Sequence, residues 1–221
     1  MNQFRSYQEP EFQKKEILRY AGCARENEEI SRMIDDCIAE CRDALTYKVC
    51  FRSFPVVFEK DEIDLSFAKL RSANLRKNLE NCSEVIVFAA TVGLAIDRLI
   101  LKYNRSKPTR ALLFQAIGAE RIESLCDCFC KEIEQSCAIR GLYPRPRFSP
   151  GYGDLPLALQ RDIFRVLDCP RAIGLTLNDS LLMTPTKSVT ALIGLSDSCA
   201  REKRGRCTAC GKTDCQFRGE E

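Results

Sequence analysis

The segment of residues 147–156 combines residue types that could hold a small charged ligand. Its sequence, RFSPGYGDLP, places one arginine among two aromatic residues, two glycines and two prolines. Glycine lets the backbone reach positive φ and approach a ligand closely, whereas proline stiffens the chain and removes a donor. Arg147 could bind a carboxylate through two parallel hydrogen bonds. Composition alone also fits an ordinary Pro-Gly turn with a solvated arginine.

The second group of chemically capable residues is a cysteine cluster near the C-terminus. Four thiolates around a compact loop would satisfy a tetrahedral metal site. Zinc and a [4Fe–4S] cluster both fit this pattern, and the spacing does not separate them. Free thiols in an unfolded tail are the alternative. The four predicted metal ligands are Cys199, Cys207, Cys210 and Cys215.

A third group, the cysteines at 126, 128 and 130, lies within a predicted helix. Cys126 and Cys130 are four residues apart and share a helix face, whereas Cys128 points elsewhere. Three thiolates therefore cannot converge on one metal without breaking the helix. We expect these cysteines to serve core packing.

Composition narrows the classes of function. The chain has 221 residues, with 14 cysteines and no histidine, which excludes a Ser-His-Asp triad and histidine metal ligands. The polar N-terminus lacks the apolar core of a signal peptide, so we expect a cytoplasmic protein with reduced thiols rather than a disulfide framework. A formal net charge of +3 is too small to indicate nucleic-acid binding by itself. No apolar run is long enough to cross a membrane.

The hydrophobic pattern mixes helices and strands without a regular βαβ rhythm, which indicates an α+β fold. Residues 1–195 are predicted to form one domain that begins with a frayed polar arm over residues 1–15. Residues 196–221 are predicted to form a metal-binding tail, since they lack apolar periodicity. Helices are expected over residues 26–45, 72–80, 94–103, 108–138 and 156–168, and strands over residues 47–58, 84–90 and 172–196.

Several motifs resemble one known family. The pattern Arg-x-x-Pro-Gly-Tyr at 147–152, followed by a proline and an amphipathic helix, resembles the S-adenosylmethionine-binding segment of the cobalamin-dependent methionine synthase reactivation domain. The run FSPGYGDLPLALQ at 148–160 resembles the small free-standing relatives of that domain more closely. Residues 123–127, 173–180 and 185–190 resemble an upstream ligand-binding helix and the closing strands of the family. Where the large domain has a paired tyrosine, this chain has Ser-Asp-Ser-Cys at 196–199.

The resemblance implies an activation-domain-like fold, with a mixed or antiparallel twisted sheet flanked by helices. It also implies a site for S-adenosylmethionine. Arg147 would help bind the ligand, Ser149 would contribute backbone contacts, and Glu123 could take the ammonium. Gly151 would admit the ligand close to the backbone, and Tyr152 would lie at the methyl-transfer junction as the catalytic residue.

The function implied is reductive reactivation of a cobalamin-dependent methionine synthase or a related corrinoid methyltransferase. A partner protein would supply the cobalamin, because this chain has no histidine to ligate cobalt. A flavodoxin or ferredoxin would supply the electron. Cobalt is the nucleophile in this chemistry, so no protein base is needed.

Two other classes of function remain open at this point. One is a zinc-binding interaction or nucleic-acid module in which the basic tail is the active part. The other is an iron–sulfur corrinoid-protein reductase that does not use S-adenosylmethionine. Binding of S-adenosylmethionine would favour the reactivation function over both.

Overall fold

The computed structural model describes residues 1–23 and 27–198. A five-stranded antiparallel sheet with the order β1-β2-β6-β10-β7 forms its centre. Two short hairpin-like sheets, β3-β4-β5 and β8-β9, accompany it. The sheet strands are β1 (Gln3–Tyr7), β2 (Tyr47–Pro55), β6 (Cys82–Thr91), β7 (Tyr143–Pro144) and β10 (Ser188–Ser196); the short strands are β3 (Val57–Phe58), β4 (Ile63–Asp64), β5 (Lys69–Leu70), β8 (Thr176–Leu177) and β9 (Met183–Thr184).

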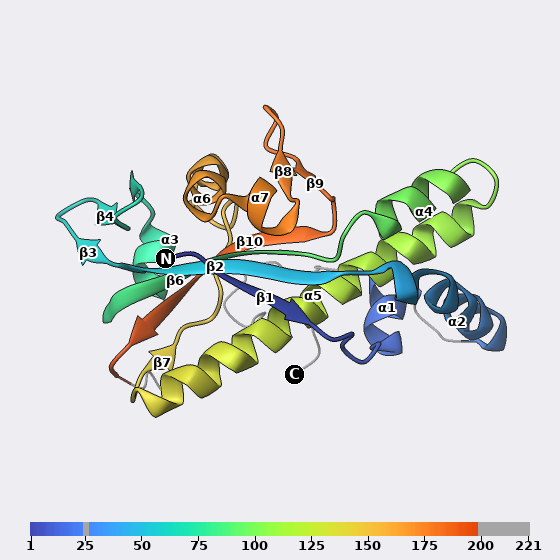
Figure 1. Ribbon diagram of the computed structural model, residues 1–221, viewed down its shortest axis with the longest axis horizontal. Helices are drawn as coiled ribbons and strands as arrows, with labels where there is room; N and C mark the ends of the chain where they lie inside the picture. The colour runs from blue at the N-terminus through green and yellow to red at the C-terminus, as the bar shows by residue number, and fades with distance from the viewer. Residues whose placement is uncertain (24–26, 199–221) are drawn as a thin grey trace.

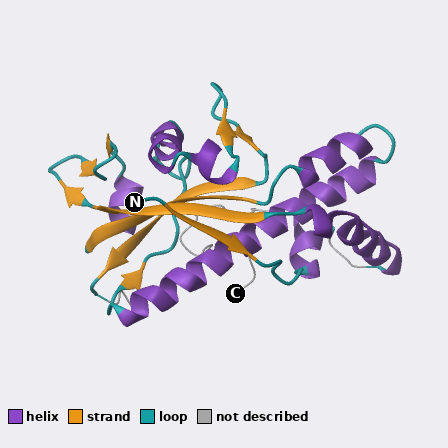
Figure 2. Ribbon diagram, viewed as in Figure 1, coloured by secondary structure: helices purple, strands orange, loops and turns teal. Residues whose placement is uncertain are grey.

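Helices cover both faces of the central sheet (Figures 1 and 2). The long helix α5 runs along one face, and α1, α2 and α4 gather near its first half (Figure 1). The helices α3, α6 and α7 lie on the other face (Figure 1). Their bounds are α1 (Lys14–Tyr20), α2 (Glu28–Cys41), α3 (Ala73–Asn78), α4 (Ala95–Tyr103), α5 (Pro108–Ile139), α6 (Leu159–Leu167) and α7 (Cys169–Ile173), with one 3-10 turn, η1 (Arg42–Ala44).

Strand β6 explains why the sheet needs two helical layers. Successive side chains of a strand point to opposite faces. Ile86 and Phe88 accordingly pack into the core beneath α5, whereas Val85 and Val87 pack into the core shared with α3, α6 and α7. A strand covered on both faces is apolar at nearly every position. The predicted strand over 84–90 is confirmed as this central strand.

Helix α5 is the main support of one face. Pro108 occupies its first turn, where the missing N–H costs nothing. The ring of Phe129 lies 5.0 Å from that of Phe51 and 4.8 Å from that of Phe88, which joins the helix to β2 and β6. Cys126 is buried beside Phe129, so the expected core-packing role of this cysteine is confirmed.

One sequence prediction about local structure was wrong, and another was wrong only at its first residues. The supposed frayed arm over 1–15 contains β1, which pairs with β2 along its whole length from Gln3↔Phe51 to Tyr7↔Tyr47. Its residues are almost all exposed, so main-chain pairing and the bonds of Arg5 and Tyr7 to Glu132 of α5 hold this edge strand, rather than side-chain burial. The predicted strands over 172–196 are present as β8, β9 and β10, but the first residues of this range belong to α7, which is capped by Gly174 in a left-handed conformation (φ +71°).

Candidate functional site

The segment that leads into the Arg-x-x-Pro-Gly-Tyr motif lies along strand β10, on the side that also pairs with the short strand β7. After β7, the amide of Arg145 donates to the carbonyl of Gly194 at 2.7 Å. Phe148 and Leu192 then exchange two hydrogen bonds, at 2.8 and 2.9 Å. Prolines at 144 and 146 favour this extended course, because each restricts the residue before it to extended backbone. The sheet therefore fixes the backbone on both sides of Arg147.

The Arg147 side chain points at two carboxylates of α5. Its Nη2 lies 2.5 Å from Oε2 of Glu123 and 3.4 Å from Oδ1 of Asp127. The two acids are four residues apart and so share one face of the helix. The arginine side chain is 13% exposed, whereas those of Glu123 and Asp127 are 39% and 47% exposed. A largely buried cation thus sits beneath two partly exposed anions.

The surroundings of Arg147 favour the protonated, positively charged guanidinium. Burial alone would lower the pKa of its guanidinium, but the adjacent Cys126, Glu123 and Asp127 more than offset that effect and raise the pKa above its ordinary value. The cluster thus holds the Arg147 cation beside two carboxylates. The hydrogen bonds of Arg147 to other described residues run from Nη2, to Glu123 and Asp127.

The motif loop, residues 149–155, follows this segment and is stabilised by hydrogen bonds within its own backbone. The amide of Tyr152 donates to the carbonyl of Ser149 at 3.1 Å, and Gly151 and Leu155 are joined by an N–H···O bond of 2.9 Å. Position 151 favours glycine because its φ is +90°, a conformation that residues with a side chain rarely adopt. The Tyr152 side chain is 69% exposed, with its ring 6.4 Å from that of Phe148. The loop therefore presents an aromatic ring to solvent on a rigid support.

Sequence reasoning missed the most strongly buried charges of the molecule, Glu120 and Arg121. The Arg121 guanidinium bonds both carboxylate oxygens of Glu120, at 2.5 and 2.6 Å, and the carbonyls of Pro10 and Glu11, at 2.5 and 2.7 Å. It also stacks 3.7 Å from the ring of Phe12. This pair ties the chain between β1 and α1 to α5. The available signal was two charges at 120 and 121, where the apolar stripe of α5 continues from Ile117.

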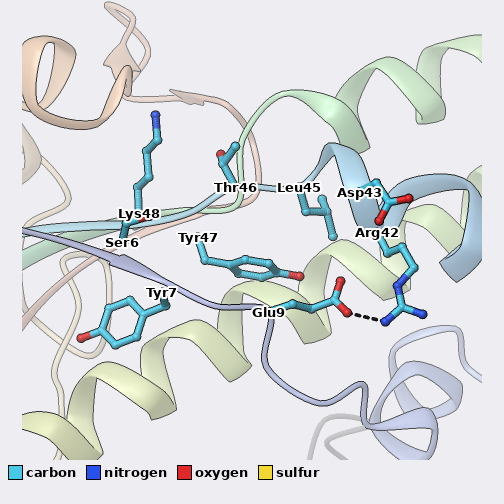
Figure 3. A pocket seen from close by; sticks show the side chains of 9 residues that line it. All are labelled: Ser6, Tyr7, Glu9, Arg42, Asp43, Leu45, Thr46, Tyr47 and Lys48. Carbon is cyan, nitrogen blue, oxygen red and sulfur yellow. Dashed lines mark hydrogen bonds and ion pairs between the residues drawn. The ribbon is translucent and has the colours of Figure 1, made fainter.

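A cavity of about 450 Å³ opens between the C-terminal end of β1 and the segment that leads into β2. Tyr7, Glu9, Arg42 and Tyr47 line it, and Glu9 and Arg42 form an ion pair of 2.6 Å across its mouth (Figure 3). None of the residues predicted to bind S-adenosylmethionine lines this cavity. Its lining carries charges of both signs and indicates no particular ligand.

The predicted metal ligands Cys199, Cys207, Cys210 and Cys215 lie outside the described residues. Within residues 1–23 and 27–198, no group of three or more histidine, cysteine or acidic side chains is arranged to hold a metal ion. In the same part of the chain, no helix has the length and apolar character needed to cross a membrane.

Comparisons with known proteins bear directly on this site. The family model described as "Vitamin B12 dependent methionine synthase, activation domain" matches residues 75–202, which include α5 and the motif loop. The chain belongs to this family. The resemblance inferred from the Arg-x-x-Pro-Gly-Tyr motif is thereby confirmed.

A comparison with solved structures also matches a member of this family. The chain is similar to a crystal structure of the MetH reactivation domain bound to AdoHcy, with a TM-score of 0.64 over 88% of this chain and 78% of that chain. Sequence identity is 13%, so the likeness concerns the fold. The predicted α+β class, with an antiparallel sheet flanked by helices, is confirmed for this member of the activation-domain family. A search of curated sequences found no match.

Proposed function

We propose that this activation domain binds S-adenosylmethionine at Arg147, Glu123 and Asp127 and presents its methyl group to a cobalamin held by a partner protein. The observation that carries the proposal is the charged cluster beside the motif loop in a chain of this family. S-Adenosylmethionine has a carboxylate, an ammonium and a sulfonium, and so bears one net positive charge. The two carboxylates of the cluster, which are partly exposed, complement the ligand's positive groups.

The ligand's polar end would bind to both signs of the cluster. The Nε or Nη1 group of Arg147 would donate a charge-assisted hydrogen bond to the ligand's carboxylate. The exposed oxygens of Glu123 and Asp127 would attract the ammonium and sulfonium. Ser149 and Gly151 would supply backbone contacts, since glycine at a positive φ leaves the backbone open to close approach.

Tyr152 would act where the two substrates meet. Its exposed ring can lie against the sulfonium or against the corrin of the partner. In the proposed reaction one electron, from a flavodoxin or ferredoxin, reduces cob(II)alamin; the reduced cobalt takes the methyl group as the carbon–sulfur bond breaks, and S-adenosylhomocysteine leaves with the sulfur electron pair. The domain contributes orientation rather than acid–base chemistry. The cysteine tail remains a proposed zinc or [4Fe–4S] site.

The first test is calorimetric titration of the whole chain with S-adenosylmethionine and with S-adenosylhomocysteine. The carboxylates of Glu123 and Asp127 should favour S-adenosylmethionine, whose sulfonium is positively charged, over S-adenosylhomocysteine, whose sulfur is uncharged. Asp127→Asn removes one of the two anions, so we expect the preference to fall by roughly threefold, in the range of a partly exposed ion pair.

Glu134→Gln is the matched control, because Glu134 is an exposed acid of the same helix beyond the charged cluster. This control should leave the preference unchanged. Absence of heat with either ligand at millimolar concentration would contradict the proposed function. An unchanged preference in Asp127→Asn would remove Asp127 from the site.

A further inference from the structure

The N-terminus of the short helix α3 is hydrogen-bonded to Asp154, near the C-terminal end of the motif loop. The Asp154 carboxylate accepts hydrogen bonds from the Ser72 hydroxyl at 2.5 Å and from the amides of Ala73 and Asn74 at 2.6 and 3.1 Å. These groups form the N-terminus of α3, where free amides favour a carboxylate. The hydrogen bond from Ser72 is the main reason that the pKa of Asp154 lies below its ordinary value.

The C-terminal end of α3 is hydrogen-bonded to the residue that precedes the motif. The Asn78 amide donates to the carbonyl of Pro146 at 3.0 Å, immediately before Arg147. One helix therefore bonds to the residue before the motif arginine and to the residue after Gly153. Leu75 of α3 and its C-cap residue Leu79 are fully buried in the core that also contains Leu155, which anchors the helix.

The motif loop also packs closely against α3 at Gly153. Gly153 adopts a φ of +54°, and a Cβ placed there would lie 2.5 Å from Nδ2 of Asn74. Only glycine fits so near α3 in that conformation. The exposed Tyr152 ring, by contrast, has a single neighbouring ring, Phe148, among the described residues. The direction of Tyr152 is therefore set by the loop backbone rather than by packing of the ring.

We propose that α3 acts as a splint for the motif loop, with Asp154 and Asn78 as positioning residues that fix Tyr152 for methyl transfer. This inference rests on the proposed function and extends it to the step at which orientation matters. A methyl group moves between two large partners only when the reacting atoms are aligned, and small displacements of a supporting group lower the rate strongly. Arg147 is held separately by β10 and α5, so binding should depend much less on the splint.

The test compares Asp154→Ala with the wild type in three measurements. Hydrogen exchange at the amides of Gly151, Tyr152 and Leu155 should become at least tenfold faster, because these amides bond within the loop. The rate of methyl transfer to cobalamin on the partner module should fall about tenfold. Affinity for S-adenosylmethionine should change less than threefold. A purely structural role would lower the melting temperature without this separation of rate from affinity.

Matched variants complete the design. Asp154→Asn keeps an acceptor at the helix N-terminus and should restore most of the rate. Asp162→Ala, which removes an exposed ion pair with Arg165 in α6, should leave all three measurements unchanged. If Asp154→Ala does not fold, Asn78→Ala loosens the opposite end of the loop and takes its place.

Unchanged exchange and an unchanged rate in these variants would overturn the splint. Failure of the wild type to bind or transfer would instead overturn the proposed function, whereas the exchange measurement would still decide whether α3 orders the loop.

Discussion

Replacing Arg147 with alanine should weaken binding of S-adenosylmethionine by roughly 10- to 150-fold, which corresponds to about 1.5–3 kcal/mol. The arginine supplies the cation for the ligand carboxylate. Its loss also leaves Glu123 and Asp127 without the charge that now lies 2.5 and 3.4 Å from them. Calorimetry on the folded variant measures the change, and circular dichroism verifies that the variant is folded.

Two variants separate ligand recognition from general loss of charge. Arg145→Ala removes an arginine two residues earlier, which donates to the Glu80 carbonyl at 2.9 Å and does not contact the acid pair. It should retain nearly full affinity. Arg147→Lys keeps the charge without the guanidinium fork and should be intermediate. Equal affinity of the wild type and Arg147→Ala would reject the assigned site.

Replacing Arg121 with methionine should lower the free energy of unfolding by about 3–5 kcal/mol, the cost of breaking a buried ion pair from one side. The Glu120 side chain is 2% exposed and would lose the cation that now pairs with it. The carbonyls of Pro10 and Glu11 would also lose their donors. Denaturant unfolding at neutral pH measures the loss.

An exposed pair provides the matched comparison. Arg165→Met breaks the ion pair of Arg165 with Asp162 on the surface of α6 and should cost less than about 1 kcal/mol. Combining Glu120→Leu with Arg121→Met should recover part of the loss, because the stranded carboxylate is gone. A loss below about 1 kcal/mol for Arg121→Met alone would contradict the role given to this pair.

The elements that the sequence predicts well are those with a repeated apolar pattern. The continuous run in β6 and the long stripe of α5 leave few alternatives, because each must be buried. Strand β1 has no such pattern: most of its side chains are exposed, and its pairing with β2 and the bonds of Arg5 and Tyr7 to Glu132 are tertiary contacts. Residues 1–15 were therefore misread as a frayed arm.

The site was predictable only in part, for a related reason. The motif at 147–152 could be recognised, yet nothing in its spacing places Arg147 on Glu123 and Asp127, which are 24 and 20 residues away. That contact depends on α5 crossing beneath the edge of the sheet. The capping of α3 by Asp154, 80 residues from Asn74, is a tertiary contact of the same kind.

The most direct test of the central claim is formation of methylcobalamin. The whole chain would be mixed anaerobically with the cobalamin-binding module of a methionine synthase from the same organism, titanium(III) citrate and S-adenosylmethionine labelled in its methyl group. We predict that cob(II)alamin absorbance is replaced by that of methylcobalamin, that the label appears on cobalt, and that S-adenosylhomocysteine accumulates in equal amount. Conversion no faster than in the same mixture without the protein would contradict the account.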